Sequence, residues 1–458
     1  MQDTTDTITT NQSVQTAKAE VAAGKRSKYR WAVLFLIFCL YTVATADRSN
    51  VGLAMPFIRQ EFSMSNTEAG ALMSLFFAGY VISMIPGGFI MRKLKPRKTL
   101  PLFMLLTSAF TAFLGFTNSI FGMQVARLGT GLSEGPVAVG MPTTINNWFP
   151  AKEKGLATGI FLGASKFGPL IVPPLCGIIV VLFGWREIFR LFAIPGAIMA
   201  VLWYFLVANK PAESRFTNAA EVDYIEHIDE REAAAPEIKT RPYNMKWLDR
   251  IVRARKIEKL DNAKKLFTNW NMVGSAAGYF FMIAITTTMM TWIPTYLTTV
   301  KHLAIMKMAF AAAAPFAGSV TGNFVGGWLS DNVFGKRRKP LMMVTTLSAS
   351  ILMLMLIYSP EDPWLLGGLL FVAGFFVALG FSAFTVYPMG LVVKEQFSIA
   401  TSITNTLGQL GGFCTPIMIG FILDHYDWDV VFGALAIGCL ICFCIVLTII
   451  EPVDDPLV

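Results

Sequence analysis

The sequence predicts an all-α integral membrane protein in which twelve transmembrane helices form two six-helix halves. Three observations predict this fold class. Hydrophobic residues make up 54% of the 458 residues and charged residues 15%, which lies outside the range of soluble globular domains. About twelve apolar runs reach the roughly 20 residues that a helix needs to cross a bilayer. A polar, charge-rich stretch near the middle of the chain separates six of these runs from the other six.

Each apolar run is assigned to one membrane span. The first half is predicted to span at 31–52, 67–91, 99–119, 121–145, 155–182 and 187–208. The second half is predicted to span at 270–298, 305–330, 340–358, 364–392, 397–422 and 428–450. The chain then divides into an N-terminal tail (1–30), a first half (31–208), a central loop (209–269), a second half (270–450) and a C-terminal tail (451–458). We expect the central loop to be a solvated linker with one surface helix, because mixed charges usually mark a wet face. Binding of a regulator by this loop is the alternative.

Lysine and arginine are concentrated in alternate loops. Outside the central loop, bases gather in four segments, at 25–30, 92–98, 152–154 and 336–339, whereas the intervening loops hold few bases and several acids. The positive-inside rule therefore predicts that both termini are cytoplasmic. The same bias explains the net charge of +8, so this charge does not indicate nucleic-acid binding. Residues 1–24 have no apolar core, so we do not expect a signal peptide.

Cysteine and histidine give no sign of a metal or catalytic site. All six cysteines lie in predicted spans without metal-ligand spacing, and all three histidines lie in loops. No nucleophile and base occur in the patterns that hydrolytic or transfer enzymes use. We therefore expect no enzyme, no metal and no cofactor. Any proton that moves through the membrane must be carried by carboxylates.

Four charged residues interrupt predicted spans and are the main candidates for function. Asp47 and Arg48 follow the apolar stretch 31–46, while Arg127 and Glu134 occur in the fourth span. A charge near the bilayer centre costs roughly 2.5 to 3.5 kcal/mol and is by default a functional residue. Arg127 and Glu134 are seven residues apart, so two helical turns place them on one face. The acids are candidate proton carriers, and a permanent structural salt bridge is the alternative.

Further polar residues in the spans predict a site for an organic anion. Arg48 is the best candidate to bind a carboxylate, because its planar fork can donate to two oxygens. Lys166, beside Ser165 in span 5, either reaches the cytoplasmic edge or makes a second anion contact. The second half supplies groups that fit a hydroxyl-rich ligand, although helix–helix hydrogen bonding is the alternative for each. These are Tyr387 and Thr385 in span 10, and Asn405 and Gln409 four residues apart in span 11.

The two halves contain a repeated loop sequence. Residues 87–92 (GGFIMR) and 326–331 (GGWLSD) each follow the second span of their half, and each precedes a basic cluster. Such a repeat predicts parallel halves with a binding site between them near the midplane. The first copy has Arg92 where the second has Asp331.

These motifs resemble those of a known transporter family. Residues 46–50 (ADRSN), Tyr80 with 86–88 (PGG), 127–136 (RLGTGLSEGP) and 148–150 (WFP) are similar to motifs of the major facilitator superfamily. Within it, they resemble the anion:cation symporter family of galactonate and hexuronate carriers, sialin and the vesicular glutamate transporters. The resemblance covers nearly the whole chain except the tail and central loop. This chain has Arg92 at a position where the superfamily normally has an acidic residue. Separately, residues 163–169 in span 5 partly match a motif of antiporters.

The resemblance also implies roles for individual residues. It implies that Asp47 and Glu134 carry protons with Arg127 as partner, and that Arg48 binds the substrate carboxylate, with Tyr80 in the same site. We expect a monomer, in the bilayer of a bacterial inner membrane, that imports an organic anion by proton symport and alternating access. The expected substrate is a sugar acid such as a hexonate or hexuronate. The alternatives are a small dicarboxylate or aromatic acid as substrate, or an anion exchanger.

Overall fold

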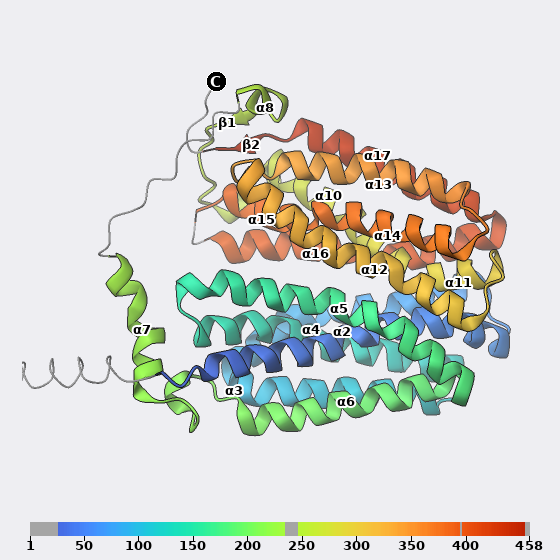
Figure 1. Ribbon diagram of the computed structural model, residues 1–458, viewed down its shortest axis with the longest axis horizontal. Helices are drawn as coiled ribbons and strands as arrows, with labels where there is room; N and C mark the ends of the chain where they lie inside the picture. The colour runs from blue at the N-terminus through green and yellow to red at the C-terminus, as the bar shows by residue number, and fades with distance from the viewer. Residues whose placement is uncertain (1–25, 234–245, 394–395, 454–458) are drawn as a thin grey trace, which may run out of the picture.

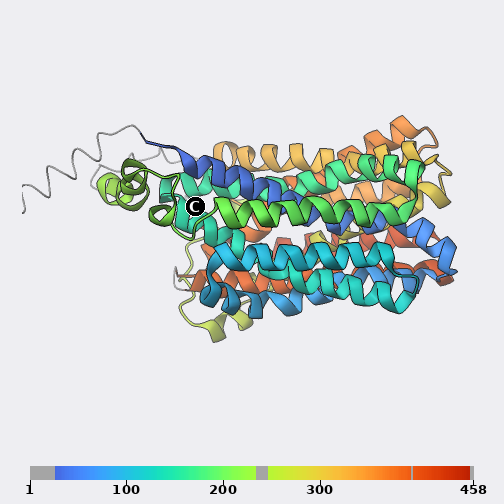
Figure 2. The same ribbon diagram turned by 90° about the horizontal axis from the view of Figure 1, so that it is seen from below.

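The computed structural model describes residues 26–233, 246–393 and 396–453. Most of the predicted N-terminal tail, part of the central loop and the end of the C-terminal tail therefore lie outside the described residues. Two bundles of long helices lie side by side and run along the long axis of the molecule (Figures 1 and 2). One bundle is formed by the first half of the chain and the other by the second half, as the repeat predicts.

The first bundle contains five helical elements, of which α3 is interrupted by a kink. They are α2 (Tyr29–Phe62), α3 (Asn66–Phe116), α4 (Ile120–Trp148), α5 (Ala151–Phe183) and α6 (Trp185–Leu206). Helix α3 contains two predicted spans, and they meet at Lys95, whose φ of 62° is left-handed rather than helical. Serines define two helix starts: Ser65 forms a capping box with Glu68, and Ser119 accepts from the backbone N–H of Gly122.

The second bundle contains several broken helices. Its elements are α10 (Trp270–Thr291), α11 (Ile293–Thr299), α12 (Ile305–Trp328), the π-helical turn η2 (Leu329–Val333), α13 (Lys339–Ile357), α14 (Pro363–Leu379), α15 (Phe381–Gly390), α16 (Phe397–His425) and α17 (Trp428–Thr448). The break between α10 and α11 falls at Trp292, two residues before Pro294, and the break between α14 and α15 falls at Gly380. Each predicted span of this half corresponds in its residue range to one helix, either continuous or broken.

The predicted number of spans agrees with the helices once α3 is divided. Ten helices of the described residues are long and apolar enough to cross a membrane, and α3 is counted among them as one. Helix α4 is not among the ten, because its glycines and polar residues lower its hydropathy. It is nevertheless packed inside the first bundle, where Arg127 and Glu134 are 2% and 0% exposed.

Glycines bring α3 and α4 into close contact. A Cβ atom on Gly131 would lie 2.0 Å from the backbone oxygen of Phe76, and one on Gly79 would lie 2.4 Å from that of Leu128. No side chain fits between the two backbones at these positions. Close approach of this kind is how membrane helices gain packing energy, since lipid provides no hydrophobic drive between them. It also holds α4, with its two charged residues, at a defined position beside α3.

The two bundles contact each other at one end of the molecule through a shared helix cap. We call the end that carries residues 92–98 and 336–339 the basic end, and the end that carries 63–65 and 426–427 the opposite end (left and right in Figure 1). At the opposite end, Asp424 of α16 accepts hydrogen bonds from the backbone N–H groups of Asn66 and Thr67, both at 2.8 Å. The Thr67 hydroxyl donates to the same carboxylate at 2.6 Å. The second half thus caps the N-terminus of α3 in the first half.

The beginning of the central loop is attached to the first bundle. It forms η1 (Pro211–Glu213) and α7 (Ala219–Ala233). Arg30, at the start of α2, is 5% exposed and forms ion pairs with Glu221 of α7 at 2.9 Å and with Glu153 of α5 at 2.7 Å. The Tyr224 hydroxyl of α7 also donates to Glu153 at 3.0 Å. The predicted surface helix exists, and buried ion pairs hold it against the bundle.

The end of the central loop is attached to the second bundle, which differs from the expected solvated linker. It forms α8 (Lys246–Ile251), β1 (Ala254–Arg255) and α9 (Ala263–Thr268), so the loop holds more than the one expected helix. Arg337 forms a buried ion pair with Asp249 of α8. Strand β1 pairs in parallel with β2 (Glu451–Pro452) beyond α17. Leu248, Val252 and Ala254 of this segment form a small buried cluster. Their burial attaches the segment to the bundle although its overall composition is polar.

Two buried charges join β2 to the helix ends around it. Lys339 is 0% exposed, and its Nζ donates to the backbone oxygens of Val252, Leu447 and Ile449 at 3.1, 3.1 and 2.6 Å. Glu451 is 2% exposed and accepts from the backbone N–H groups of Arg338 and Lys339 at 3.0 and 2.7 Å. Glu451 therefore caps α13, while Lys339 caps the end of α17.

Glu451 is expected to make the stability of this end depend on pH. Burial raises the pKa of Glu451 from 4.5 to about 7, although its two backbone hydrogen bonds act in the opposite direction. Because this pKa is higher in the folded chain, its stabilising contribution is complete below about pH 4.5 and is lost as the pH rises through about 7. The shift corresponds to roughly 3 kcal/mol.

The comparison of the wild type with Glu451→Gln tests this prediction, because glutamine keeps an acceptor but does not titrate. We expect the apparent Tm of the wild type in detergent to fall more than that of the variant between about pH 5 and about pH 8. Equal changes in the two proteins would contradict the prediction. Other titrating groups contribute equally to both and cancel in the comparison.

Candidate functional site

The centre of the candidate site is an ion pair between Arg48 of α2 and Glu134 of α4. The Nε and Nη2 atoms of Arg48 lie 2.6 and 2.5 Å from Oε1 of Glu134. The Glu134 side chain is fully buried, and the Arg48 side chain is 15% exposed. The helix-face argument placed Glu134 on the face of Arg127, and the structure shows that its direct partner comes from another helix. The two helices that carry the predicted charged residues therefore meet at this pair.

Asp47 and Arg127 form the second part of the charged cluster. Asn50 donates from Nδ2 to Oδ1 of Asp47 at 3.1 Å, and Arg127 donates from Nη1 to the backbone oxygen of Asp47 at 3.3 Å. Asp47 and Arg127 are each 2% exposed. Arg127 is an electrostatic neighbour of both acids, but within the described residues it forms no direct ion pair with either carboxylate. It supplies positive charge to the cluster without occupying the carboxylate oxygens.

Aromatic rings separate and support the two arginines. The Arg48 guanidinium lies 4.7 Å from the ring centroid of Tyr80, and that of Arg127 lies 4.9 Å from the centroid of Phe76. The Phe76 ring centroid is also 5.7 Å from the Arg48 guanidinium, so this ring contacts both cations. Cation–π contacts favour charge at a ring face and are strongest where water is excluded. Tyr80 is thus placed beside Arg48, as the sequence predicts.

Several polar atoms of this cluster have no hydrogen-bond partner. In the described residues these include Oε2 of Glu134, Nε of Arg127 and Oδ1 of Asn50, all of them buried. Unpaired buried polar atoms are rare and each requires an explanation. A bound anion would supply an acceptor for Nε of Arg127, whereas Oε2 of Glu134 and Oδ1 of Asn50 would each need a donor such as a hydroxyl group or water. The cluster therefore has unused donors and acceptors of the kind that an anion with hydroxyl groups would satisfy.

The second bundle contributes aromatic groups opposite this cluster. Lys166 of α5 places its Nζ 4.1 Å from the ring centroid of Phe381, the first residue of α15. The Phe381 ring lies 5.3 Å from that of Tyr279 in α10. Tyr279 is an electrostatic neighbour of Tyr80 and Arg48. The contact between Lys166 and Phe381 therefore joins the two halves at the level of the charged cluster.

The remaining predicted residues are distributed differently. Asn405 and Gln409 are half-buried and lie within one turn of Gly408, where a Cβ atom would lie 2.3 Å from the Tyr279 ring, so both are at the level of the site. Ser165 donates its hydroxyl to the Leu162 backbone at 2.6 Å and keeps only its acceptor capacity. Tyr387 lies apart, because its hydroxyl donates to the Ile450 backbone beside Glu451. We therefore do not include Tyr387 in the site proposed below.

Five residues of this site were not expected from the sequence: Tyr41, Asn50, Phe76, Tyr279 and Phe381. Phe76 precedes Tyr80 by four residues and so lies on the same face of α3. Asn50 lies in the motif of Asp47, but its contact with the carboxylate was not foreseen. Tyr41 is 6% exposed and precedes Arg48 by seven residues, so the two-turn spacing could have identified it. Tyr279 and Phe381 belong to the second bundle, and no spacing in the sequence relates them to Arg48. Their distance from the charged cluster depends on how the two halves pack.

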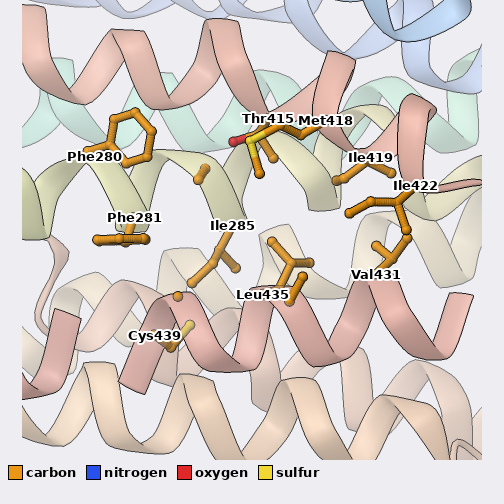
Figure 3. A pocket seen from close by; sticks show the side chains of 13 residues that line it. Phe280, Phe281, Ile285, Thr415, Met418, Ile419, Ile422, Val431, Leu435 and Cys439 are labelled. Atoms are coloured by element: carbon orange, nitrogen blue, oxygen red, sulfur yellow. The ribbon is translucent and has the colours of Figure 1, made fainter. Parts of the chain in front are cut away.

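The hollow shown in Figure 3 does not belong to the charged cluster. Its lining comes from α10, α16 and α17 of the second bundle and includes Phe280, Ile285, Ile419 and Leu435. The lining is almost entirely apolar, and Met418 at its edge is 54% exposed. An apolar groove on one bundle gives no partner to a charged ligand. The candidate site is therefore the cluster between α2, α4 and α5.

Comparison with known proteins gives the family of this chain. The model of the Major Facilitator Superfamily matches residues 37–413 and 307–457. The chain belongs to the Major Facilitator Superfamily. It is accordingly a multi-pass membrane transporter and not an enzyme. This confirms the predicted fold class and the resemblance drawn from the span 1, 2 and 4 motifs.

Curated relatives of this superfamily member include proteins named as transporters of sugar acids. A probable galactarate/D-glucarate transporter of Bacillus subtilis is 26% identical over 441 residues, which cover 92% of each chain. A D-galactonate transporter of Escherichia coli O6:H1 is 25% identical and covers 89% of this chain and 92% of its own. A hexuronate transporter of Bacillus subtilis is 26% identical, with coverage of 87% and 89%.

Two solved structures show the same fold at lower identity. A bacterial homologue of the human lysosomal transporter Spinster, in an inward-facing and occupied conformation, has a TM-score of 0.70 and 15% identity, and covers 92% of this chain and 97% of its own. A D-xylose-proton symporter has a TM-score of 0.70 and 16% identity, with coverage of 94% and 100%. Both likenesses show that the chain shares the fold of these two transporters.

Proposed function

We propose that this protein imports a sugar acid by proton symport, with alternating access of the site to the two sides of a bacterial inner membrane. The observation that carries the proposal is the buried pair of Arg48 and Glu134, which has one carboxylate oxygen on the cation and the other unpaired. In this orientation the basic end faces the cytoplasm, following the distribution of lysine and arginine. The relatives named for galactonate, hexuronate and galactarate support the substrate class.

Competition for Arg48 couples the proton to the anion. The ionised Glu134 occupies the Arg48 fork, so a substrate carboxylate has to displace it. Protonation removes the charge of Glu134 and releases Arg48 for the substrate. Each ligand therefore raises the affinity for the other, and this coupling free energy is reciprocal. Asp47 holds a second proton, next to Arg127, in the same buried cluster.

The two ends of the molecule support an alternating-access mechanism. The cap formed by Asp424 on α3 holds the two bundles together at the opposite end. At the basic end each bundle carries its own segment of the central loop, through Glu221 in the first and Asp249 in the second. Each bundle can thus move with its own attached segment. Rocking of two such halves about a fixed site is the general mechanism of these transporters.

Uptake by purified protein in liposomes tests this function. With an acidic exterior, we expect labelled D-galactonate or a hexuronate to accumulate above its equilibrium level. An uncoupler that collapses the proton gradient should reduce the internal concentration to that equilibrium level. Saturable counterflow that does not depend on pH would instead identify an anion exchanger. Protein-free liposomes and liposomes containing Asp47→Asn provide the controls.

A further inference from the structure

Lys166 is a cation within the site to which the symport mechanism gives no partner. It lies fifteen residues after the first residue of α5, or about 22 Å along the helix axis, so its side chain is too far from the basic end to reach water there. Its Nζ instead rests on the Phe381 ring of the other half. Within the described residues it makes no hydrogen bond or ion pair. A cation in a membrane span normally has a counter-charge, and here none is supplied by the protein.

The acids of the cluster are already engaged by other groups. Glu134 is bound by Arg48, and Asp47 is contacted by Asn50 and lies next to Arg127. The charged group that acts on Lys166 is Arg48, a second cation. Two positive charges therefore lie near the contact between the bundles without a shared anion. A ligand with one acid group can neutralise only one of them.

The charge of the whole site favours a ligand with two acid groups. Three cations, Arg48, Arg127 and Lys166, accompany two acids, so the empty site with both acids ionised carries one net positive charge. When both acids are protonated, the site carries three. A bound dianion returns the net charge to one, whereas a monoanion leaves two. Because charge in a low-dielectric interior is costly, the dianion gives the loaded carrier the same site charge as the empty one.

We propose that the substrate is a dianion with an acid group at each end, of which Arg48 binds one and Lys166 binds the other. This inference rests on the proposed function and narrows its substrate class to an aldarate, a sugar acid oxidised at both ends. Phe381 holds the ammonium group in place until the second acid group arrives. The names of the relatives include carriers for both acid types, so Lys166 decides between them. Two protons and one dianion together carry no net charge.

Galactarate and galactonate are matched probes for this proposal, because they differ at one end only, where galactarate has a carboxylate and galactonate a hydroxymethyl group. In the wild-type protein, we expect unlabelled galactarate to inhibit the uptake of labelled galactarate at a lower concentration than unlabelled galactonate does. Lys166→Gln should lower the ratio of galactarate to galactonate transport, in kcat/KM, by roughly tenfold or more. Lys166→Arg should restore the preference. Lys154→Gln removes a cation nearer the start of the same helix and should not change the ratio.

The electrical signature provides an independent readout. In the wild type, galactarate uptake should acidify the liposome interior without a net current, whereas galactonate uptake should carry inward positive current. If galactonate is preferred, or if Lys166→Gln changes both substrates equally, the dianion proposal is wrong. If neither acid accumulates in the wild type, the proposed function itself fails.

Discussion

Asp47→Asn should abolish proton-driven accumulation of substrate while the protein still folds. An asparagine side chain cannot bind a proton on one side of the membrane and release it on the other. Its shape is almost the same as that of aspartate. The backbone oxygen that receives the Arg127 hydrogen bond also remains in place, so the local structure is preserved. Uptake against a gradient should therefore fall to the level of protein-free liposomes. The measurement is uptake with an acidic exterior, and Asp429→Asn, at an exposed acid outside the site, is the control.

Glu134→Gln should differ from Asp47→Asn in the step that it leaves intact, which is the exchange of substrate. Its neutral amide no longer competes for Arg48, so the variant should bind and exchange substrate but should not accumulate it. Exchange is measured by counterflow with labelled substrate outside and unlabelled substrate inside. Wild-type accumulation in Asp47→Asn would show that Asp47 is not a coupling site. Complete loss of exchange in Glu134→Gln would show that Glu134 does more than carry a proton.

Gly131→Ala should strongly destabilise the first bundle. The added Cβ atom would lie 2.0 Å from the Phe76 backbone oxygen, so α3 and α4 would have to move apart. Overpacking of this kind typically costs about 1 to 3 kcal/mol, and we expect the upper end because backbone atoms cannot rotate away. The shift would also move Phe76, which contacts both arginines. The measurement is the apparent Tm of the purified protein together with the yield of monodisperse protein.

Gly88, in the neighbouring helix α3, controls for the general effect of replacing glycine by alanine. A Cβ on Gly88 would meet nothing within 4 Å. Gly88→Ala should leave the Tm unchanged or raise it slightly, because alanine favours helix by up to about 1 kcal/mol. Similar Tm values for the two variants would contradict this prediction, because they would show that α3 and α4 can move apart at Gly131 at little cost in stability.

The sequence predicted the position of the spans and the composition of the charged cluster for physical reasons. A bilayer imposes length and hydropathy on each helix, so the ranges could be read from apolar runs. A charge in a span is costly, so Asp47, Arg48, Arg127 and Glu134 were recognisable one by one. The two-turn spacing placed the last two on a common face, and the structure brings both into one cluster with Arg48.

Contacts between helices were beyond sequence reasoning. Glu134 pairs with Arg48 because α2 and α4 pack at a particular rotation, which no spacing within one helix reports. Tyr387 was expected in the site, but it follows the break at Gly380, and its hydroxyl donates to the Ile450 backbone. The contact of Lys166 with Phe381 joins two halves that local patterns treat separately. The buried ion pairs of Arg30 and Arg337 likewise attach a loop whose composition indicated only solvent exposure.

The cap that Asp424 places on α3 is a contact between the two bundles that can be exchanged for water at little cost. When the bundles separate at that end, the N–H groups of Asn66 and Thr67 pass from a carboxylate to water, which satisfies them almost as well. The exposed carboxylate is rehydrated at the same time. The net free energy of such a latch is about 1 kcal/mol, comparable with thermal energy. The cap therefore adds a small, reversible bias to a contact whose main part is the backbone packing of α3 against α16 at Gly70 and Gly420.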